Sequence, residues 1–425
     1  MTGRLRLSPR SLERHRMTWG VVSFRPILRV IFPCVASARC RASGGTNMSA
    51  TGFGVPKGAI LFEENGFQYE FREYLGEIHQ GVHLLLAWRR EGGQPQDKVL
   101  IKAIGPSNAT HPPISRIKRA RVRLEEQVRL SKFLVHPGIL EVHKMKQVEG
   151  TLYVVNEFPS GNSLSSLLTL VGECRRWYSS EFTMFVGARV ADVLAFAHGA
   201  KDERWRPLNI VHRAIDADHV FLDWKGIVRV SDFGLALSTL PGRVASTLPR
   251  PQGDHFYCSP EMLLGKRVDA RSDLFSLGVL MLEMSTGHNL LYAPDEVTAE
   301  VKASLSPSQL RRVMRAIQRA HLSGGNPLLE DAIWRAATYT QADVDRLTAN
   351  LYEGLRVTIR KLLHRVPEER YQTAGELAEH LNRWLGEPTF TPADVMTELK
   401  SVMDEAGRRM AGTELQHSLA ENTSA

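Results

Sequence analysis

The sequence predicts an α+β protein of two lobes, because strand-like segments come first along the chain and helical segments follow them. Residues 66–103 consist of short strand-like runs separated by glycine turns. After Gly161 the apolar residues recur with helical spacing, and this pattern continues to about residue 385. The chain shows no internal repeat, which excludes a repeat architecture. The glycine turns fall at Gly76, Gly81 and Gly92-Gly93.

Local patterns predict the individual elements. Val99-Leu100-Ile101 is a buried-strand pattern that ends in a charge, Lys102. A basic helix is predicted over residues 114–134, where His136-Pro137-Gly138 closes it. Further strands are predicted at 152–155, 220–222 and 228–230, the last two joined by a turn at Lys225-Gly226.

The formal charge of +8 is concentrated at the N-terminus. Residues 1–47 contain nine arginines, no lysine and one acidic residue, so this leader carries the whole net charge. The remaining chain is neutral and lacks the basic excess that DNA or RNA binding requires, so we expect no nucleic-acid partner. An apolar content of 43% and a charged content of 24% are typical of a globular protein.

We expect residues 1–58 to be a basic leader that is disordered or not translated, with Met48 as an alternative start. Its apolar stretch over 21–38 is interrupted by two arginines and a proline, which argues against a signal peptide and a membrane helix. We expect no membrane span elsewhere. The four cysteines have neither zinc-ligand nor disulfide-framework spacing, which favours a reduced, cytoplasmic protein.

Seven short motifs follow one another in a fixed order between residues 68 and 386. They are Leu75-Gly76-Glu77-Ile78-His79-Gln80-Gly81, Lys102, Val211-His212-Arg213, Ser231-Asp232-Phe233-Gly234, Ser259-Pro260-Glu261, Asp273-Leu274-Phe275-Ser276-Leu277-Gly278 and Arg370. Each motif is weak alone, but their order and spacing resemble the protein kinase family. An additional stretch at 202–208 resembles the eukaryotic-like Ser/Thr protein kinases of bacteria.

The resemblance implies a two-lobed protein-kinase fold over residues 68–386. A β-rich N-lobe would occupy 68–159 and a mostly helical C-lobe 160–386. Arg370 would pair with Glu261, as the late arginine of the family pairs with the A-P-E glutamate. Residues 387–425 would form a C-terminal helix followed, from about Gly412, by a disordered tail.

The resemblance also implies a site for ATP and Mg²⁺. Lys102 would hold the α and β phosphates, and a glutamate on the next helix would position it. We favour Glu126 over Glu125, although family spacing counted back from His136 reaches Gln127. Asp232 would bind Mg²⁺, because a hard cation prefers carboxylate oxygen.

The phosphate loop and the adenine pocket depart from the family pattern. Gly76 and Gly81 are retained, and they would let backbone N–H groups approach the phosphates. Ile78 replaces a further glycine, and Leu100 replaces the small alanine that touches adenine in the family. Glu157 falls in the hinge. These departures predict loosened nucleotide binding.

The catalytic loop departs most, since H-R-D-L-K-P-x-N reads here as His212-Arg213-Ala214-Ile215-Asp216-Ala217-Asp218-His219. Ala214 replaces the aspartate that accepts the proton of the substrate hydroxyl. Asp216 replaces the lysine that neutralises the γ-phosphate, and its alternative role is that of a displaced base. His219 replaces the asparagine that helps to hold the second Mg²⁺, which leaves it a weak candidate metal ligand. Asp216 and Asp254 place negative charge where positive charge is wanted.

Two further features carry weaker hypotheses. Ser238, Thr239, Ser246 and Thr247 lie where kinases carry activating phosphates, which the retained Arg213 could pair; ordinary loop hydroxyls are the simpler interpretation. Thr391-Pro392 predicts the start of a helix. That helix would pack on the large lobe or bind a partner through one apolar stripe. The stripe comprises Val395, Leu399, Val402, Met403 and Ala406.

Three functions fit the sequence. The first is a regulatory pseudokinase that binds ATP, or a partner kinase, and transfers phosphate weakly or not at all. The second is an active ATP-dependent Ser/Thr kinase, acting on a protein substrate with Asp216 as a displaced base. The third is an interaction scaffold that has lost ATP as well. Whether the chain is an enzyme is left open by the replacement at Ala214.

Overall fold

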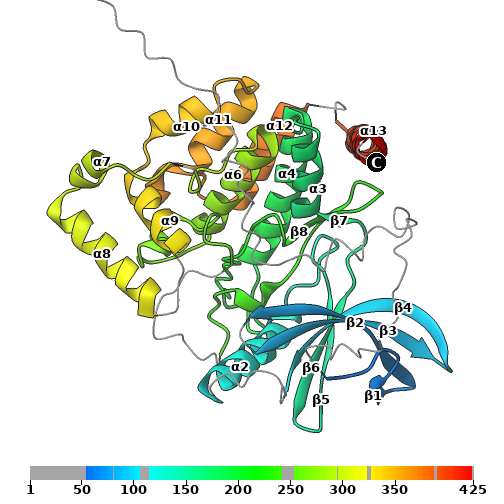
Figure 1. Ribbon diagram of the computed structural model, residues 1–425. Helices are drawn as coiled ribbons and strands as arrows, with labels where there is room; N and C mark the ends of the chain where they lie inside the picture. The colour runs from blue at the N-terminus through cyan, green and yellow to red at the C-terminus, as the bar shows by residue number, and fades with distance from the viewer. Residues whose placement is uncertain are drawn as a thin grey trace, which may run out of the picture.

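The computed structural model describes residues 54–79, 81–105, 114–241, 253–293, 295–322, 327–386 and 390–423. The arginine-rich leader, Gln80, Ser246 and Thr247 lie outside these residues. A sheet lobe and a larger helical lobe meet in the middle of the described chain, with the sheet and α2 below the helices in Figure 1. The predicted two-lobed α+β fold is therefore confirmed.

The small lobe is one curled sheet with strand order β1-β2-β3-β4-β6-β5, in which every neighbouring pair is antiparallel. Its two faces are buried differently. One face buries aromatic and aliphatic side chains such as Tyr69, Phe71 and Ile101, and the other face packs on α2 through Leu124. The elements are β1 (Ile60–Glu64), β2 (Phe67–His79), β3 (Val82–Glu91), β4 (Gln94–Ile104), α2 (Ile114–Ser131), β5 (Val142–Val148) and β6 (Thr151–Glu157).

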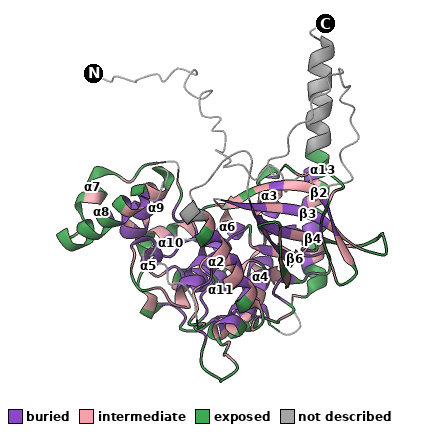
Figure 2. Cartoon of the chain, turned by 90° about the horizontal axis from the view of Figure 1, so that it is seen from below, coloured by how far each residue is buried: buried purple, intermediate pink, exposed green. Residues whose placement is uncertain are grey.

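The large lobe is built around two buried helices, α4 and α6, which are apolar on nearly every side and appear purple in Figure 2. A short sheet of β7, β8 and β9 lies where this lobe meets the small one. The first part of the lobe comprises β7 (Asn162–Ser163), α3 (Leu164–Glu173), α4 (Ser180–His198), β8 (Val220–Leu222), β9 (Val228–Val230), η2 (Phe233–Leu235) and α5 (Pro260–Leu263). The predicted strands at 220–222 and 228–230 are thus confirmed.

The remaining helices complete the large lobe and surround α6. They are α6 (Arg271–Thr286), α7 (Ala299–Ala303), α8 (Pro307–Leu322), α9 (Pro327–Thr338), α10 (Gln341–Leu347), α11 (Glu353–Leu362), η3 (Pro367–Glu369), α12 (Ala374–Leu385) and α13 (Pro392–Thr423). None of the helices in the described ranges is long and apolar enough to cross a membrane.

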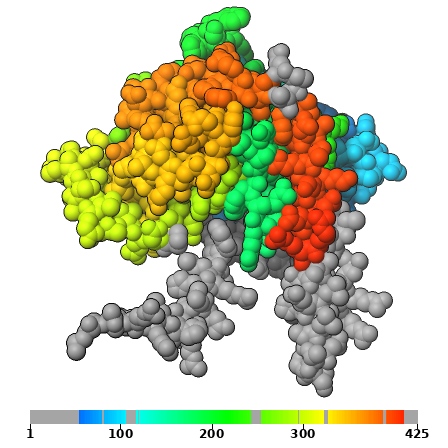
Figure 3. Space-filling model, turned by 90° about the horizontal axis from the view of Figure 1, so that it is seen from above, coloured from blue at the N-terminus to red at the C-terminus, as the bar shows by residue number. Residues whose placement is uncertain are grey.

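Helix α13 packs on α3, and Figure 3 shows the two segments side by side, in red and green. Val395, Leu399 and Val402 are fully buried there, so the stripe predicted from the sequence covers the large lobe. Both carboxylate oxygens of Glu398 bind Ser179, accepting from its N–H at 2.7 Å and its hydroxyl at 2.6 Å. The helix extends to Thr423, and the disordered tail expected from about Gly412 stays a prediction.

Candidate functional site

A buried aspartate of α6 fixes the backbone of the catalytic loop. Asp273 is fully buried and accepts hydrogen bonds from the N–H groups of His212 at 2.7 Å and Arg213 at 2.8 Å. His198 contacts the same carboxylate at 2.8 Å. The His212 ring then packs edge-on against Phe233, with centroids 4.5 Å apart. A fixed charge in the core thus sets the position of the whole loop.

Lys102 extends from β4 into the space between the lobes and meets Asp232. Its Nζ lies 2.7 Å from Asp232 Oδ1, and both side chains are largely buried. Asp232 has a positive φ of 58°, and its side chain also accepts from the N–H of Gly234 at 3.0 Å. The structure therefore brings together the two residues that the sequence assigned to phosphate and metal.

The helix residue beside Lys102 is Gln127, whose Oε1 accepts from Nζ at 3.3 Å. The structure thus places Gln127 beside Lys102, where the sequence analysis favoured Glu126. Helix α2 buries Leu124, Gln127 and Leu130 along one stripe, whereas Glu126 lies about 100° away around the helix. Family spacing had reached Gln127, but the preference for a carboxylate outweighed it.

This replacement changes the electrostatics around the lysine. A glutamine offers a neutral acceptor, and the carboxylate that pairs with Lys102 is that of Asp232. A Cβ added to Gly234 would lie 2.7 Å from Asp232 Oδ1 and 2.9 Å from Gln127 Oε1. The glycine thus lets α2 and the Asp232 turn approach closely.

The phosphate loop is a tight hairpin between β2 and β3. Gly76 has a φ of 118° and lies at an irregularity in the β2–β3 register. The N–H of Gly81 donates to the Glu77 carboxylate at 2.6 Å. A carboxylate of the chain itself is therefore bound to an N–H group that is expected to face phosphate. Ile78 packs onto the cluster between the sheet and α2. The Glu77 carboxylate and the packed Ile78 side chain thus anchor the loop.

Glu157 is fixed at the hinge by contacts from both lobes. Its carboxylate forms an ion pair with Arg229 of β9 and accepts from the N–H of Glu141 at 3.1 Å. The nearby Asn156 amide donates to its own strand, at the Val154 carbonyl 3.0 Å away. Sequence reasoning missed Arg229, because a charged residue inside a three-residue strand carries no motif.

The position of the missing base is closed by packing. Ala214 is 4% exposed, and a Cβ added to Gly253 would lie only 2.8 Å from the Ala214 Cβ. The backbone at Gly253, which has a φ of 70°, therefore lies directly against the methyl group. Little room is left there for a carboxylate.

Asp216 is bound within the catalytic loop. Its Oδ1 accepts from the N–H groups of Asp218 at 3.0 Å and His219 at 3.1 Å, and the His219 Nδ1 lies 2.6 Å away. Burial would raise the pKa of Asp216, but the His219 charge and these hydrogen bonds outweigh it and lower the pKa. Burial would lower the pKa of His219, yet Asp216 raises it to about 9. The pair is therefore an imidazolium and a carboxylate at neutral pH.

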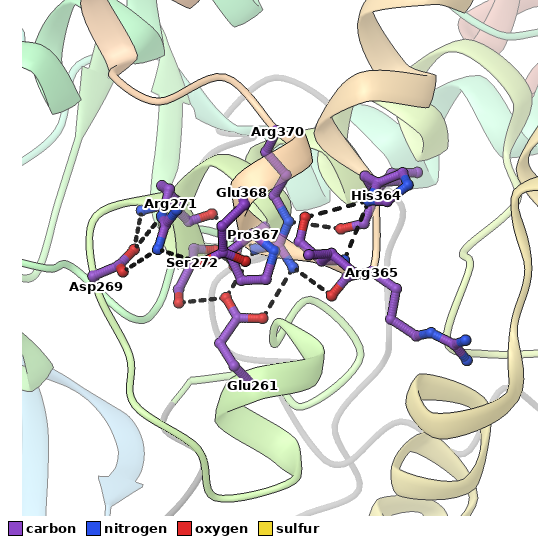
Figure 4. A network of polar contacts seen from close by, with 12 residues as sticks. Glu261, Asp269, Arg271, Ser272, His364, Arg365, Pro367, Glu368 and Arg370 are labelled. Atoms are coloured by element: carbon purple, nitrogen blue, oxygen red, sulfur yellow. Dashed lines mark hydrogen bonds and ion pairs between the residues drawn. The ribbon is translucent and has the colours of Figure 1, made fainter. Parts of the chain in front are cut away.

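Away from the cleft, Arg370 binds Glu261 in the large lobe, as predicted (Figure 4). The two guanidinium nitrogens donate to the two carboxylate oxygens at 2.8 and 2.9 Å, and Ser272 donates to Glu261 at 2.6 Å. Arg370 is 2% exposed and also donates to the His364 carbonyl at 2.7 Å. This pair joins α5, which contains Glu261, to the residue that follows η3.

The residues in the cleft fit ATP and Mg²⁺ in part. Lys102 and Asp232 would hold the phosphates and a metal, which together supply the transferable phosphoryl group and neutralise its charge. Arg213, which the sequence analysis offered as a partner for an activating phosphate, donates to the Leu235 carbonyl through Nε at 2.7 Å. Among the described residues, no three His, Cys, Asp or Glu side chains are grouped as metal ligands. His219 as an imidazolium has no lone pair to offer through Nδ1.

The sheet lobe, the helical lobe, the buried Asp273 beneath the catalytic loop and the Lys102–Asp232 contact together define a protein of the two-lobed kinase fold. The protein kinase domain model matches residues 96–382, so this chain belongs to the protein kinase family.

Relatives of known name agree with this family. The chain is 29% identical over 290 residues to the tyrosine-protein kinase MasK of Myxococcus xanthus, covering 68% of this chain and 38% of the relative. It is 26% identical over 258 residues to the probable serine/threonine-protein kinase CPE1738 of Clostridium perfringens, covering 61% and 31%. It is 30% identical over 163 residues to the human serine/threonine-protein kinase Nek2, covering 38% and 36%. The alignments thus span between 31% and 38% of the length of these relatives.

Proposed function

We propose that this chain is a pseudokinase: a kinase-fold regulator that binds ATP with Mg²⁺ and transfers phosphate very slowly or not at all. One observation carries the proposal, namely that Ala214 stands at the base position with Gly253 packed against it. The partner would be another protein kinase or a protein substrate with Ser/Thr hydroxyls, in a bacterial cytoplasm.

The expected loss of rate follows from the missing base. A positioned general base contributes about 10²–10⁴-fold, which is roughly 3–5 kcal/mol. A kinase that turns over at about 1–100 s⁻¹ would fall to about 10⁻⁴–1 s⁻¹ from this loss alone. The negative Asp216 in place of a lysine should lower the rate further, since the γ-phosphate is itself an anion.

A radiolabelled-phosphate assay tests the proposal. Purified protein with Mg-ATP and general Ser/Thr substrates should give no transfer above that of the Lys102→Ala variant, which removes the phosphate ligand. Robust transfer that Lys102→Ala abolishes would refute the pseudokinase. If Asp216→Asn also abolished it, the displaced base would be supported instead. The hydrogen bonds that occupy Asp216 Oδ1 disfavour that outcome.

A scaffold without ATP is favoured by a different observation. Glu77 occupies the N–H of Gly81, and Lys102 is neutralised by Asp232. Bound nucleotide would have to displace Glu77 and share Lys102. A thermal-shift titration separates the candidates, because a ligand at 100 times its Kd stabilises the native state by about 2.7 kcal/mol. If about millimolar Mg-ATP did not shift the unfolding midpoint, the scaffold that does not bind ATP would be the supported function.

A further inference from the structure

A polar cavity lies in the large lobe, next to the Glu261–Arg370 pair. It has a volume of about 590 Å³ and is walled by the loop after α5, by α8 and by the residues that lead into η3. Five cations line it, and one of them, Arg271, is paired with acidic residues of the same walls. The other four are Lys266, Arg267, Arg312 and Arg365. We call this cavity, with these four further cations, the basic pocket. Its volume lies in the range of ligand sites in proteins.

The acidic residues of the same walls are already paired with other cations. Glu261 is bound by Arg370, which lies behind the pocket. Asp269 and Glu368 are both bound by Arg271, at 2.8 and 3.2 Å. The local carboxylates therefore do not neutralise the four cations of the basic pocket.

The four cations have no acidic partner within the described parts of the chain. Lys266, Arg267 and Arg312 are exposed and form no ion pair there. Arg365 donates to the Ala337 carbonyl at 2.7 Å and extends away from the Glu261–Arg370 pair in Figure 4. The pocket thus presents an excess of positive charge to solvent.

The like charges also affect one another. Partial burial of the Lys266 ammonium group and the neighbouring cations, Arg312 foremost, lower the pKa of Lys266, although the Glu261 charge acts in the opposite direction. A bound anion would relieve this repulsion. Three of the four cations are arginines, whose planar guanidinium groups bind phosphate oxygens in pairs, and a phosphate monoester carries about 1.5–2 negative charges at pH 7.

We propose that the basic pocket binds a phosphorylated side chain of a protein partner. Phosphate matches the charge and the arginine geometry better than a single carboxylate does. The opening among exposed residues admits a polypeptide segment. The site lies apart from the nucleotide cleft and does not depend on whether ATP binds.

Fluorescence anisotropy with a labelled phosphoserine peptide flanked by glycine and alanine tests the proposal. The phosphopeptide should bind at least about tenfold more tightly than its unphosphorylated match, because charge-assisted hydrogen bonds favour phosphate. Lys266→Gln combined with Arg312→Gln should lower that affinity about tenfold or more. The matched control combines Arg311→Gln with Arg315→Gln, removes two charges from exposed positions of α8 outside the pocket lining, and should change affinity less than about twofold.

Two further arms locate the site and identify the source of the phosphate. Lys102→Ala should bind the phosphopeptide like the parent protein, since the nucleotide cleft is not involved. Inorganic phosphate should compete only at concentrations at least about tenfold higher than the phosphopeptide. The proposal is overturned if both peptides bind alike, if the two double variants lose affinity equally, if Lys102→Ala abolishes binding, or if inorganic phosphate competes with equal potency.

Discussion

Replacing Arg370 by alanine tests how far the large lobe depends on one buried ion pair. The substitution leaves the Glu261 carboxylate, which is 4% exposed, without its cation. It also removes donors from the carbonyls of His364 and Arg271, at 2.7 and 3.1 Å. Removing one partner of a buried pair costs about 3–5 kcal/mol, because the other charge stays buried and unpaired.

The unfolding midpoint should therefore fall by roughly 6–20 °C, at about 2–4 °C per kcal/mol for a large domain. Differential scanning fluorimetry measures this shift. Arg356→Ala is the matched control, because Arg356 pairs with Glu353 on the surface of α11, where the side chains are 40% and 58% exposed. Surface pairs contribute about 0–1 kcal/mol, so this variant should stay close to the parent midpoint.

The same variant predicts a pH dependence with a defined sign. Burial would raise the pKa of Glu261, but the hydrogen bonds and charge of Arg370 outweigh it and lower the pKa below 4.5. The pair therefore stabilises the parent protein above the unfolded pKa, and this contribution is lost as the pH falls through the folded pKa. Without Arg370 only the hydrogen bonds from Ser272 and the backbone oppose the effect of burial, so the pKa of Glu261 should rise and the protonated acid is favoured more than in the parent protein.

The difference in the free energy of unfolding between Arg370→Ala and the parent protein should accordingly become smaller when the pH falls from about 8 to about 5. A deficit below about 1 kcal/mol would contradict the reasoning, because a charge left unpaired in the core costs more. A deficit of the same size at both pH values would show that lost packing, and not the stranded carboxylate, causes the destabilisation.

Three further predictions concern the cleft. Gln127→Glu should raise the affinity for Mg-ATP about three- to tenfold by calorimetry, since a carboxylate there would pair with Lys102 and release Asp232. Glu77→Gln should raise it about threefold in the same assay, because the N–H of Gly81 would no longer be held by a charged acceptor. Asp216→Asn should move the titration midpoint of His219, followed by NMR, from about 9 toward the ordinary 6.5. Because this pKa is raised, the stabilisation by the Asp216–His219 pair is complete below pH 6.5 and lost as the pH rises through about 9.

Each of these predictions has a control or an opposing outcome. Glu126→Gln should leave the Mg-ATP affinity unchanged, since Gln127 and not Glu126 contacts Lys102. Glu73→Gln, on the same strand as Glu77, should also have no effect. An unchanged affinity in Gln127→Glu would mean that Asp232 is not held by Lys102 in solution. A His219 midpoint that stays near 9 in Asp216→Asn would show that another group stabilises the imidazolium.

The order of motifs was enough to predict the two lobes, because the first motifs lie among strand-like segments and the last ones among segments with helical periodicity. Helical phase was harder. Glu126 and Gln127 differ by one residue, and only the burial of Leu124 and Leu130 on the same stripe shows which of them faces Lys102.

The motifs indicated the Glu261–Arg370 pair, but the other contacts between distant or unmarked residues could not be predicted. The Glu77 carboxylate reaches Gly81 only because the hairpin is tight, which depends on side-chain geometry. The basic pocket combines residues from 260 to 368 that share no motif and no period. The apolar stripe of α13 was visible as a pattern, but its partner α3 lies more than 200 residues away.

The attachment of α13 has a practical consequence for anyone who shortens this chain. Pro392 contacts the turn at Gly226, and the helix then covers α3 and binds the first turn of α4 through Glu398. Deleting the segment after residue 386, where the match to the protein kinase domain has already ended, would expose the surface of the large lobe that Val395 covers. It would also leave Ser179 without the carboxylate that accepts its hydrogen bonds. A shortened form that retains residues up to about 409 keeps this face covered, and an affinity tag is better placed beyond it.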